Sequence, residues 1–164
     1  MMICLFLIIS FLLEGMFTNF ISTNSVLIPL FTLTSLVVIY PYFNKKNINY
    51  IIICLIMGVL YDVVFINSLF INTICFSIMG GLTILCYSFV KYNIYTSNII
   101  NILILIAYRI ITYIMLLSIN YITFNSSILF KGIYSSILIN VLYAIMSYFI
   151  LEIIAKIFNK NRVE

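Results

Sequence analysis

Three ionisable residues lie inside long apolar runs, where an ionised side chain needs a specific reason to be present. Glu14 falls in "FLLEG" at residues 11–15, Asp62 in "GVLYDVVF" at residues 58–65, and Arg109 in "LIAYRIITY" at residues 105–113. A charge at the centre of a membrane helix costs about 3 kcal/mol or more unless a partner compensates it. The two carboxylates and the guanidinium are therefore the first candidates for a functional cluster.

These three residues support more than one interpretation. They fall at compatible depths in three different predicted spans, so Arg109 can reach one or both carboxylates. A buried ion pair of this kind would fix helix packing and would explain how Asp62 is tolerated. A proton or cation relay is a second interpretation, although a transport route usually has a longer polar lining. The third is a face that a partner protein contacts.

Catalytic and metal-binding patterns are absent from the sequence. The chain has no histidine, which removes the commonest general base and the commonest transition-metal ligand. It has no Ser/His/Asp set, no H-E-x-x-H and no glycine-rich phosphate loop. We expect no enzymatic activity, no catalytic residue, no metal and no cofactor. The cysteines form no C-x-x-C pair, and we expect them to be buried and reduced: Cys4, Cys54, Cys75 and Cys86.

The composition indicates a protein that is surrounded by membrane lipid. Of the 164 residues, 65% are apolar and only 7% are charged. Runs of about twenty apolar residues can cross a hydrocarbon core of about 30 Å. They predict an all-α integral membrane protein with a single transmembrane domain over residues 1–164. The six predicted spans are residues 2–21, 26–43, 48–66, 70–90, 97–118 and 133–157, and only residues 119–132 leave room for a longer loop.

Basic residues are concentrated on one side of the predicted spans. With the N-terminus inside, only Lys131 falls on the outer side. The positive-inside rule then predicts a multi-pass protein of the bacterial cytoplasmic membrane with both termini in the cytoplasm. The formal charge of +4 lies mainly at span ends and gives no indication of nucleic-acid binding. The residues on the cytoplasmic side are Lys45, Lys46, Lys91, Lys156, Lys160 and Arg162.

Small and polar residues recur at helical spacing and mark predicted helix contacts. Gly58 and Asp62 share one helix face, four residues apart. We interpret each stripe as a packing face within the chain or as a contact face for a partner. A second stripe contains Thr73, Ser77 and Gly81, and a third contains Ser136, Asn140, Ala144 and Ser147.

Several of these residues also match a known pattern. "FLLEG" closes a leucine-rich first span, "GVLYDVVFINSLF" at residues 58–70 has the spacing G-x-x-x-D, and Lys91 ends the following span. On these residues, and on its length, span count and orientation, the chain resembles the rod shape-determining protein MreD family. Phe70 stands where that family usually has glycine, and Pro29 is the nearest match to a proline expected near the start of the second span.

The resemblance implies a non-enzymatic scaffold of the bacterial cell-elongation complex, the elongasome, which carries out peptidoglycan synthesis and sets cell shape. It implies partnership with MreC, and with MreB, RodA and a class B penicillin-binding protein. The alternative is a substrate-binding S-component of an energy-coupling-factor vitamin transporter, which has a similar six-helix, S-component-like bundle. The first span lacks the alanines with which S-components usually dock on their coupling subunit, so we favour the scaffold.

Overall fold

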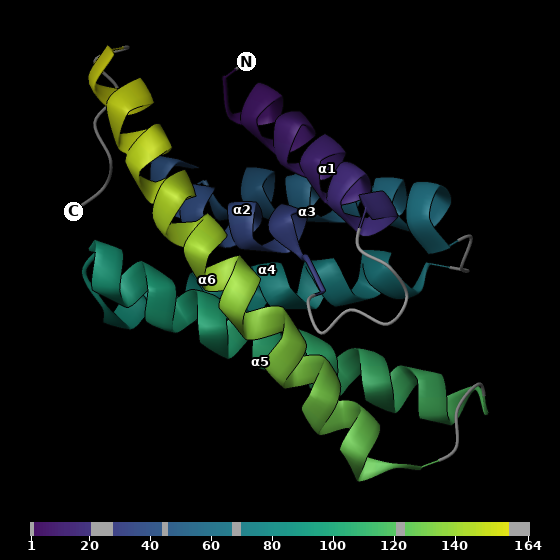
Figure 1. Cartoon of the computed structure of the whole chain (residues 1–164). Helices are drawn as coiled ribbons and strands as arrows, with labels where there is room; N and C mark the ends of the chain where they lie inside the picture. The colour runs from purple at the N-terminus through teal and green to yellow at the C-terminus, as the bar shows by residue number, and fades with distance from the viewer. Residues whose placement is uncertain (1, 21–27, 44–45, 67–69, 121–123, 158–164) are drawn as a thin grey trace.

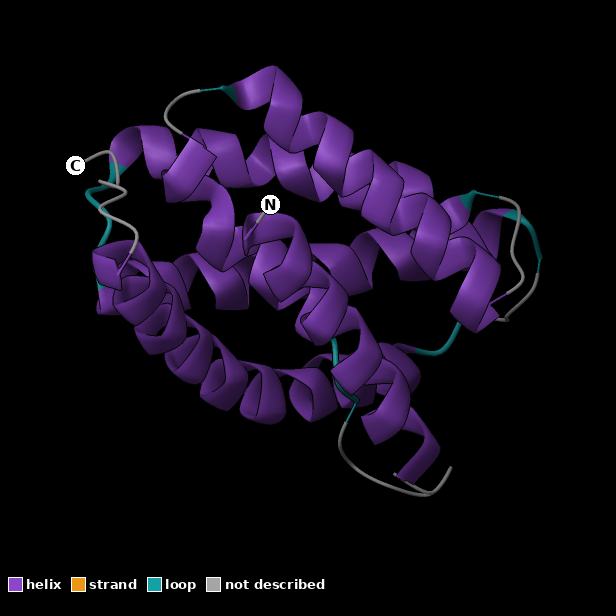
Figure 2. Cartoon of the chain, turned by 90° about the horizontal axis from the view of Figure 1, so that it is seen from above, coloured by secondary structure: helices purple, strands orange, loops and turns teal. Residues whose placement is uncertain are grey.

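The chain folds into helices that are joined by short connections. The computed structural model describes residues 2–20, 28–43, 46–66, 70–120 and 124–157, and these residues contain no strand. The all-α prediction is confirmed for this part of the chain (Figure 2). The elements are α1 (Met2–Phe20), α2 (Phe31–Ile39), the 3₁₀ turn η1 (Tyr40–Phe43), α3 (Asn47–Tyr61), the π-helical turn η2 (Asp62–Ile66), α4 (Ile71–Phe89), α5 (Ile94–Ser118) and α6 (Ser126–Ile157).

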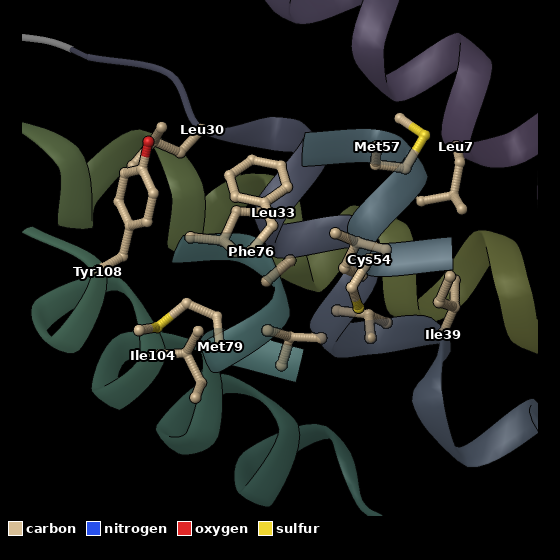
Figure 3. Packing of buried hydrophobic residues seen from close by; sticks show 14 of the residues in the cluster. Leu7, Leu30, Leu33, Ile39, Cys54, Met57, Phe76, Met79, Ile104 and Tyr108 are labelled. Carbon is tan, nitrogen blue, oxygen red and sulfur yellow. The ribbon is translucent and has the colours of Figure 1, made fainter. Parts of the chain in front are cut away.

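The short helix α2 lies at the centre of the fold. All of its residues are buried, and it contacts α1, α4, α5 and α6. Helix α3 packs against α4, and α4 packs against α5. Helix α6 packs on α2 and α5 and runs diagonally across the front of the molecule (Figure 1). The resulting apolar core includes Leu33 of α2, Cys54 of α3, Phe76 of α4 and Ile104 of α5 (Figure 3).

Within the described residues, four helical segments are long and apolar enough to cross a membrane. They are Asn47–Phe65, Ile71–Phe89, Ile94–Ser118 and Leu129–Ile157. Two further apolar helices, Ile3–Asn19 and Phe31–Phe43, are shorter. At a rise of 1.5 Å per residue the second of these is only about 20 Å long. The structure is thus that of a membrane protein with four candidate spans, whereas the count of six spans and the S-component-like arrangement stay predictions.

The second predicted span, residues 26–43, contains a shorter helix than expected. Helix α2 begins only at Phe31, after the non-helical N-cap residue Leu30, and Pro29 disfavours helical backbone in the preceding Ile28. At the other end Pro41 lacks the N–H that an α-helix needs, and the chain tightens into η1. Residues 26 and 27 of this prediction, like residue 21 of the first span, lie outside the described residues.

The predicted loop over residues 119–132 is wrong from residue 126 onward. Helix α6 starts at Ser126 and continues to Ile157. The Asn125 side chain accepts hydrogen bonds from the N–H (3.0 Å) and the hydroxyl (2.7 Å) of Ser127, as N-cap residues do. The Tyr113 hydroxyl donates to the Asn125 carbonyl at 3.0 Å and accepts from the Asn125 N–H. The Asn125 cap and the contact of Asn125 with Tyr113 of α5 therefore explain why the helix starts before the predicted residue 133.

Candidate functional site

The Asp62 carboxylate is bound to the first turn of α4. Its Oδ1 atom accepts hydrogen bonds from the backbone N–H of Asn72 (3.0 Å) and from the Asn72 side-chain amide (2.9 Å). Its Oδ2 atom accepts from the backbone N–H of Thr73 (2.8 Å) and from the Thr73 hydroxyl (2.7 Å). Four donors on two oxygens match an ionised carboxylate, which can only accept. Because Asp62 is just 2% exposed, these bonds take the place of water.

Helix α4 needs an external acceptor because no cap is provided by the residue before it. That residue, Phe70, has a left-handed backbone (φ 58°, ψ 16°) and forms no side-chain cap hydrogen bond. The first N–H groups of a helix have no partner within the helix, and in a bilayer an unsatisfied N–H is costly. The positive end of the helix dipole also favours an anion. Asp62 meets both requirements.

Gly58 brings α3 close enough to α4 for this contact. A Cβ atom at residue 58 would lie 2.6 Å from the Cα atom of Thr73 and 3.0 Å from the carbonyl oxygen of Asn72. Gly58 and Asp62 are four residues apart and therefore lie on the same side of α3. The G-x-x-x-D spacing thus has a physical reason: the glycine permits the close approach, and the aspartate binds the helix end that approaches.

A chain of hydrogen bonds continues from Asp62 to α5. The side-chain oxygen of Asn72 accepts from the Tyr108 hydroxyl at 2.7 Å, while its amide nitrogen donates to Asp62. Asn72 and Tyr108 are both buried. The Tyr108 bond fixes the orientation of the Asn72 amide, so the site connects α3, α4 and α5.

Glu14 has a corresponding position at the start of α2. Its Oε2 atom accepts from the backbone N–H of Thr32 at 2.8 Å, and its Oε1 atom accepts from the Tyr61 hydroxyl at 2.8 Å. Glu14 is fully buried, and Leu30, which precedes α2, provides no side-chain cap. Glu14 and Asp62 therefore each bind the first turn of the helix that follows their own. Because Tyr61 adjoins Asp62 in the chain, the two sites are neighbours.

Arg109 is half-buried, and Glu14 is among the groups around its guanidinium. Its guanidinium interacts electrostatically with Tyr108, Tyr61 and Glu14. The Nε and Nη2 atoms are buried and have no hydrogen-bond partner within the described part of the chain. In the sequence interpretation, Arg109 compensates the charge of Asp62. In the structure, the backbone N–H groups at the N-terminus of α4 do so. A joint cluster of Glu14, Asp62 and Arg109 stays a prediction.

The stripe predicted on the last span lies on the buried face of α6. Its Asn140 binds the segment that leads into α2: the side-chain oxygen accepts from the Leu30 N–H at 2.8 Å, and the amide nitrogen donates to the Ile28 carbonyl at 3.2 Å. The start of α2 is therefore held by Asn140 as well as by Glu14. Each residue of the stripe is at most 1% exposed: Ser136, Asn140, Ala144 and Ser147.

The stripe predicted on α4 lies only partly at a helix contact. Thr73 binds Asp62, and the Ser77 hydroxyl donates to the Thr73 carbonyl at 2.8 Å. A Cβ atom at Gly81 would have no neighbour within 4 Å, whereas one at Gly80 would lie 2.8 Å from the Cys54 sulfur. Gly80 is thus the close-packed glycine, and a contact of Gly81 with a partner stays a prediction.

Sequence reasoning missed the side chains that complete these sites. Tyr61 donates to Glu14, Tyr108 donates to Asn72, and Tyr143 donates to Ser10 of α1. A signal was present for two of them, because Tyr61 directly precedes Asp62 and Tyr108 directly precedes Arg109. For Asn72 the sequence offered only a weaker signal, namely an amide side chain near the start of the predicted span over residues 70–90.

Comparison with known proteins places these residues in a family. The model of the family described as rod shape-determining protein MreD matches residues 1–157, a range that includes both carboxylates, Gly58 and all described residues of α6. Neither the curated proteins nor the solved structures gave a match to the chain. The family match confirms the resemblance that rests on the G-x-x-x-D motif. Since it covers nearly the whole sequence, the chain belongs to the MreD family of rod shape-determining proteins.

Proposed function

We propose that this protein is a non-enzymatic membrane scaffold of the bacterial cell-elongation complex. MreC is its proposed direct partner, and MreB, RodA and a class B penicillin-binding protein belong to the same assembly. Membership of the family gives the role in rod-shape determination. The observation that carries the finer proposal is that α4 occupies both oxygens of Asp62. A carboxylate bound in this way supports helix arrangement, because its lone pairs are not available to a substrate or a proton.

A scaffold of this kind acts through the faces that its helices present. The outer face of α1 includes Leu5, Leu12 and Met16, and that of α6 includes Leu142 and Met146, all of which are exposed. Such faces suit lipid or the membrane helix of a partner. The hydrogen bonds at Asp62 and Glu14 hold the packing on which the relative positions of these faces depend.

We further propose six spans, an S-component-like bundle and cytoplasmic termini. If each helix crosses the membrane, Lys46 before α3, Lys91 after α4 and Lys156 near the end of α6 lie on one side, and Lys131 lies on the other. The positive-inside rule assigns the side with three lysines to the cytoplasm. The short helix α2 would then be accommodated by local thinning of the bilayer.

Depletion of the protein in a rod-shaped host tests the proposal. We expect cells to become round and lyse, while vitamin uptake stays at its normal rate. Restoring expression of the unchanged chain should restore rods. Rod-shaped cells with impaired uptake of a vitamin would contradict the scaffold and would support the S-component alternative.

A further inference from the structure

A hollow of about 560 Å³ lies where η1 and the start of α3 meet the end of α4 and the α4–α5 connection. We propose that it binds the phosphate headgroup of an anionic phospholipid. This site is distinct from the one around Asp62, which lies at the opposite end of α4. The polar part of the lining consists of Tyr40, Asn47, Tyr87, Ser88, Lys91 and Tyr92, and the apolar part consists of Pro41, Ile84, Phe89 and Val90.

The charge of the side chains that line this hollow favours the binding of an anion. Lys91 lines it, and no acidic residue is among the described residues that do. Asn47 also lines an adjoining hollow that contains Lys46, so a second ammonium group is close by. Basic pockets near the ends of membrane helices are suited to anionic headgroups, since each lysine near the surface adds attraction.

Hydrogen-bond donors are available for a phosphate. The Asn47 side-chain oxygen accepts from the Tyr40 hydroxyl at 3.0 Å, so the amide nitrogen of Asn47 is left to donate to a ligand. Lys91 is exposed and supplies up to three further donors. A phosphate oxygen can accept from both groups, and charge-assisted hydrogen bonds of this kind are the strong ones.

The apolar side of the hollow indicates that the phosphate belongs to a lipid. Phe89 is 86% exposed, and Leu85, one turn earlier on α4, is exposed as well, so acyl chains have an apolar surface beside the lysine. Tyr40 and Tyr87 stack with ring centroids 5.5 Å apart, and tyrosines are enriched at the level of lipid headgroups. A free phosphate ion would use only the polar part of the lining, whereas an anionic phospholipid uses both.

Native mass spectrometry of the purified, delipidated chain in detergent tests the proposal. Phosphatidylglycerol and phosphatidylcholine are added at equal concentrations, and the bound fractions are compared. We expect phosphatidylglycerol to bind preferentially, and Lys91→Gln to lower its affinity by about fivefold, as expected for the loss of one lysine near an anionic headgroup. Lys131→Gln, at the start of α6, is the matched control and should bind as the unchanged chain does.

A second variant tests the shape of the hollow without changing its charge. Ser88 is exposed and lines the hollow, so Ser88→Leu should fill part of it and lower phosphatidylglycerol binding while the melting temperature stays the same. The proposal is overturned if both lipids bind equally or if Lys91→Gln binds phosphatidylglycerol normally. Equal losses in Lys91→Gln and Lys131→Gln would also overturn it. Displacement of the lipid by an equal concentration of inorganic phosphate would identify a free-phosphate site instead.

Discussion

Asp62 accepts four hydrogen bonds from Asn72 and Thr73, and Glu14 accepts one from Thr32 and one from Tyr61. At the scale of single residues, these acids satisfy N–H groups that are buried inside the protein. The first N–H groups of a helix have no partner within the helix, and at α2 and α4 they meet carboxylates that are at most 2% exposed. A carboxylate from another helix satisfies them and is itself stabilised by the donors that it binds.

The loss of the Asp62 carboxylate should destabilise the fold. Asp62→Ala leaves two backbone N–H groups and two side-chain donors without their acceptor. We expect it to lower the free energy of unfolding by about 2 kcal/mol or more, at or above the upper end for helix caps in water. Asp62→Asn keeps one acceptor oxygen and should cost less. The measurement is denaturant unfolding of the purified protein in mild detergent.

Glu152→Ala is the control for this substitution, because it removes a half-buried carboxylate from α6 rather than one at a helix N-terminus. We expect a change of about 0.5 kcal/mol or less, as for a surface pair with Lys156 four residues later. If Asp62→Ala proved as stable as Glu152→Ala, the capping role of Asp62 would be refuted.

Substitution of Phe70 by glycine should stabilise the protein. The Phe70 φ of 58° lies in the left-handed region, which costs a residue with a Cβ atom about 1–2 kcal/mol. Phe70→Gly should therefore raise the free energy of unfolding by about 1 kcal/mol. Phe130→Gly is the matched control, since Phe130 is similarly exposed but helical, and glycine should destabilise the protein there. A loss of stability in both variants would show that residue 70 is not strained.

At the scale of elements, the contact between α3 and α4 depends on a single missing Cβ atom. Gly58→Ala would place a methyl group 2.6 Å from the Thr73 backbone, so the helices must separate and the hydrogen bonds to Asp62 must lengthen. We expect a loss of about 2 kcal/mol or more in unfolding free energy, typical of overpacking. Gly81→Ala, with open space around it, should be neutral or stabilising by up to about 1 kcal/mol. Equal effects of the two substitutions would contradict the close contact.

Much of this element-scale picture could be predicted from the sequence, and the remainder has physical reasons. Pro29 and Pro41 were visible signs of a shortened second helix, and the sequence "NSS" at residues 125–127 was a visible cap. The partner of Asp62 could not be predicted, because backbone N–H groups of another helix leave no trace in residue types. Gly80 and Gly81 differ by one step of about 100° around α4, and spacing alone did not decide which one faces α3.

At the scale of the whole molecule, the lysines predict the orientation in the membrane. Cysteines introduced at Asn47 and Asn125 of a cysteine-free variant should react from opposite sides, since Asn47 is the first residue of α3 and Asn125 directly precedes α6, and both are exposed. An impermeant thiol reagent added to intact cells should label Asn125→Cys and should reach Asn47→Cys only after the membrane is opened. Labelling of Asn47→Cys in intact cells would reverse the orientation.

We propose that the helix arrangement fixed by Asp62 and Glu14 presents faces to MreC. Affinity purification of the chain from membranes in mild detergent, with quantification of the proteins recovered with it, tests this claim most directly. We predict MreC at a constant ratio to the chain. Gly81→Ala should keep that ratio, and Gly58→Ala should lower it when compared at equal amounts of purified chain. Recovery of an ATPase module in place of MreC would contradict the account and would identify the chain as a transporter component.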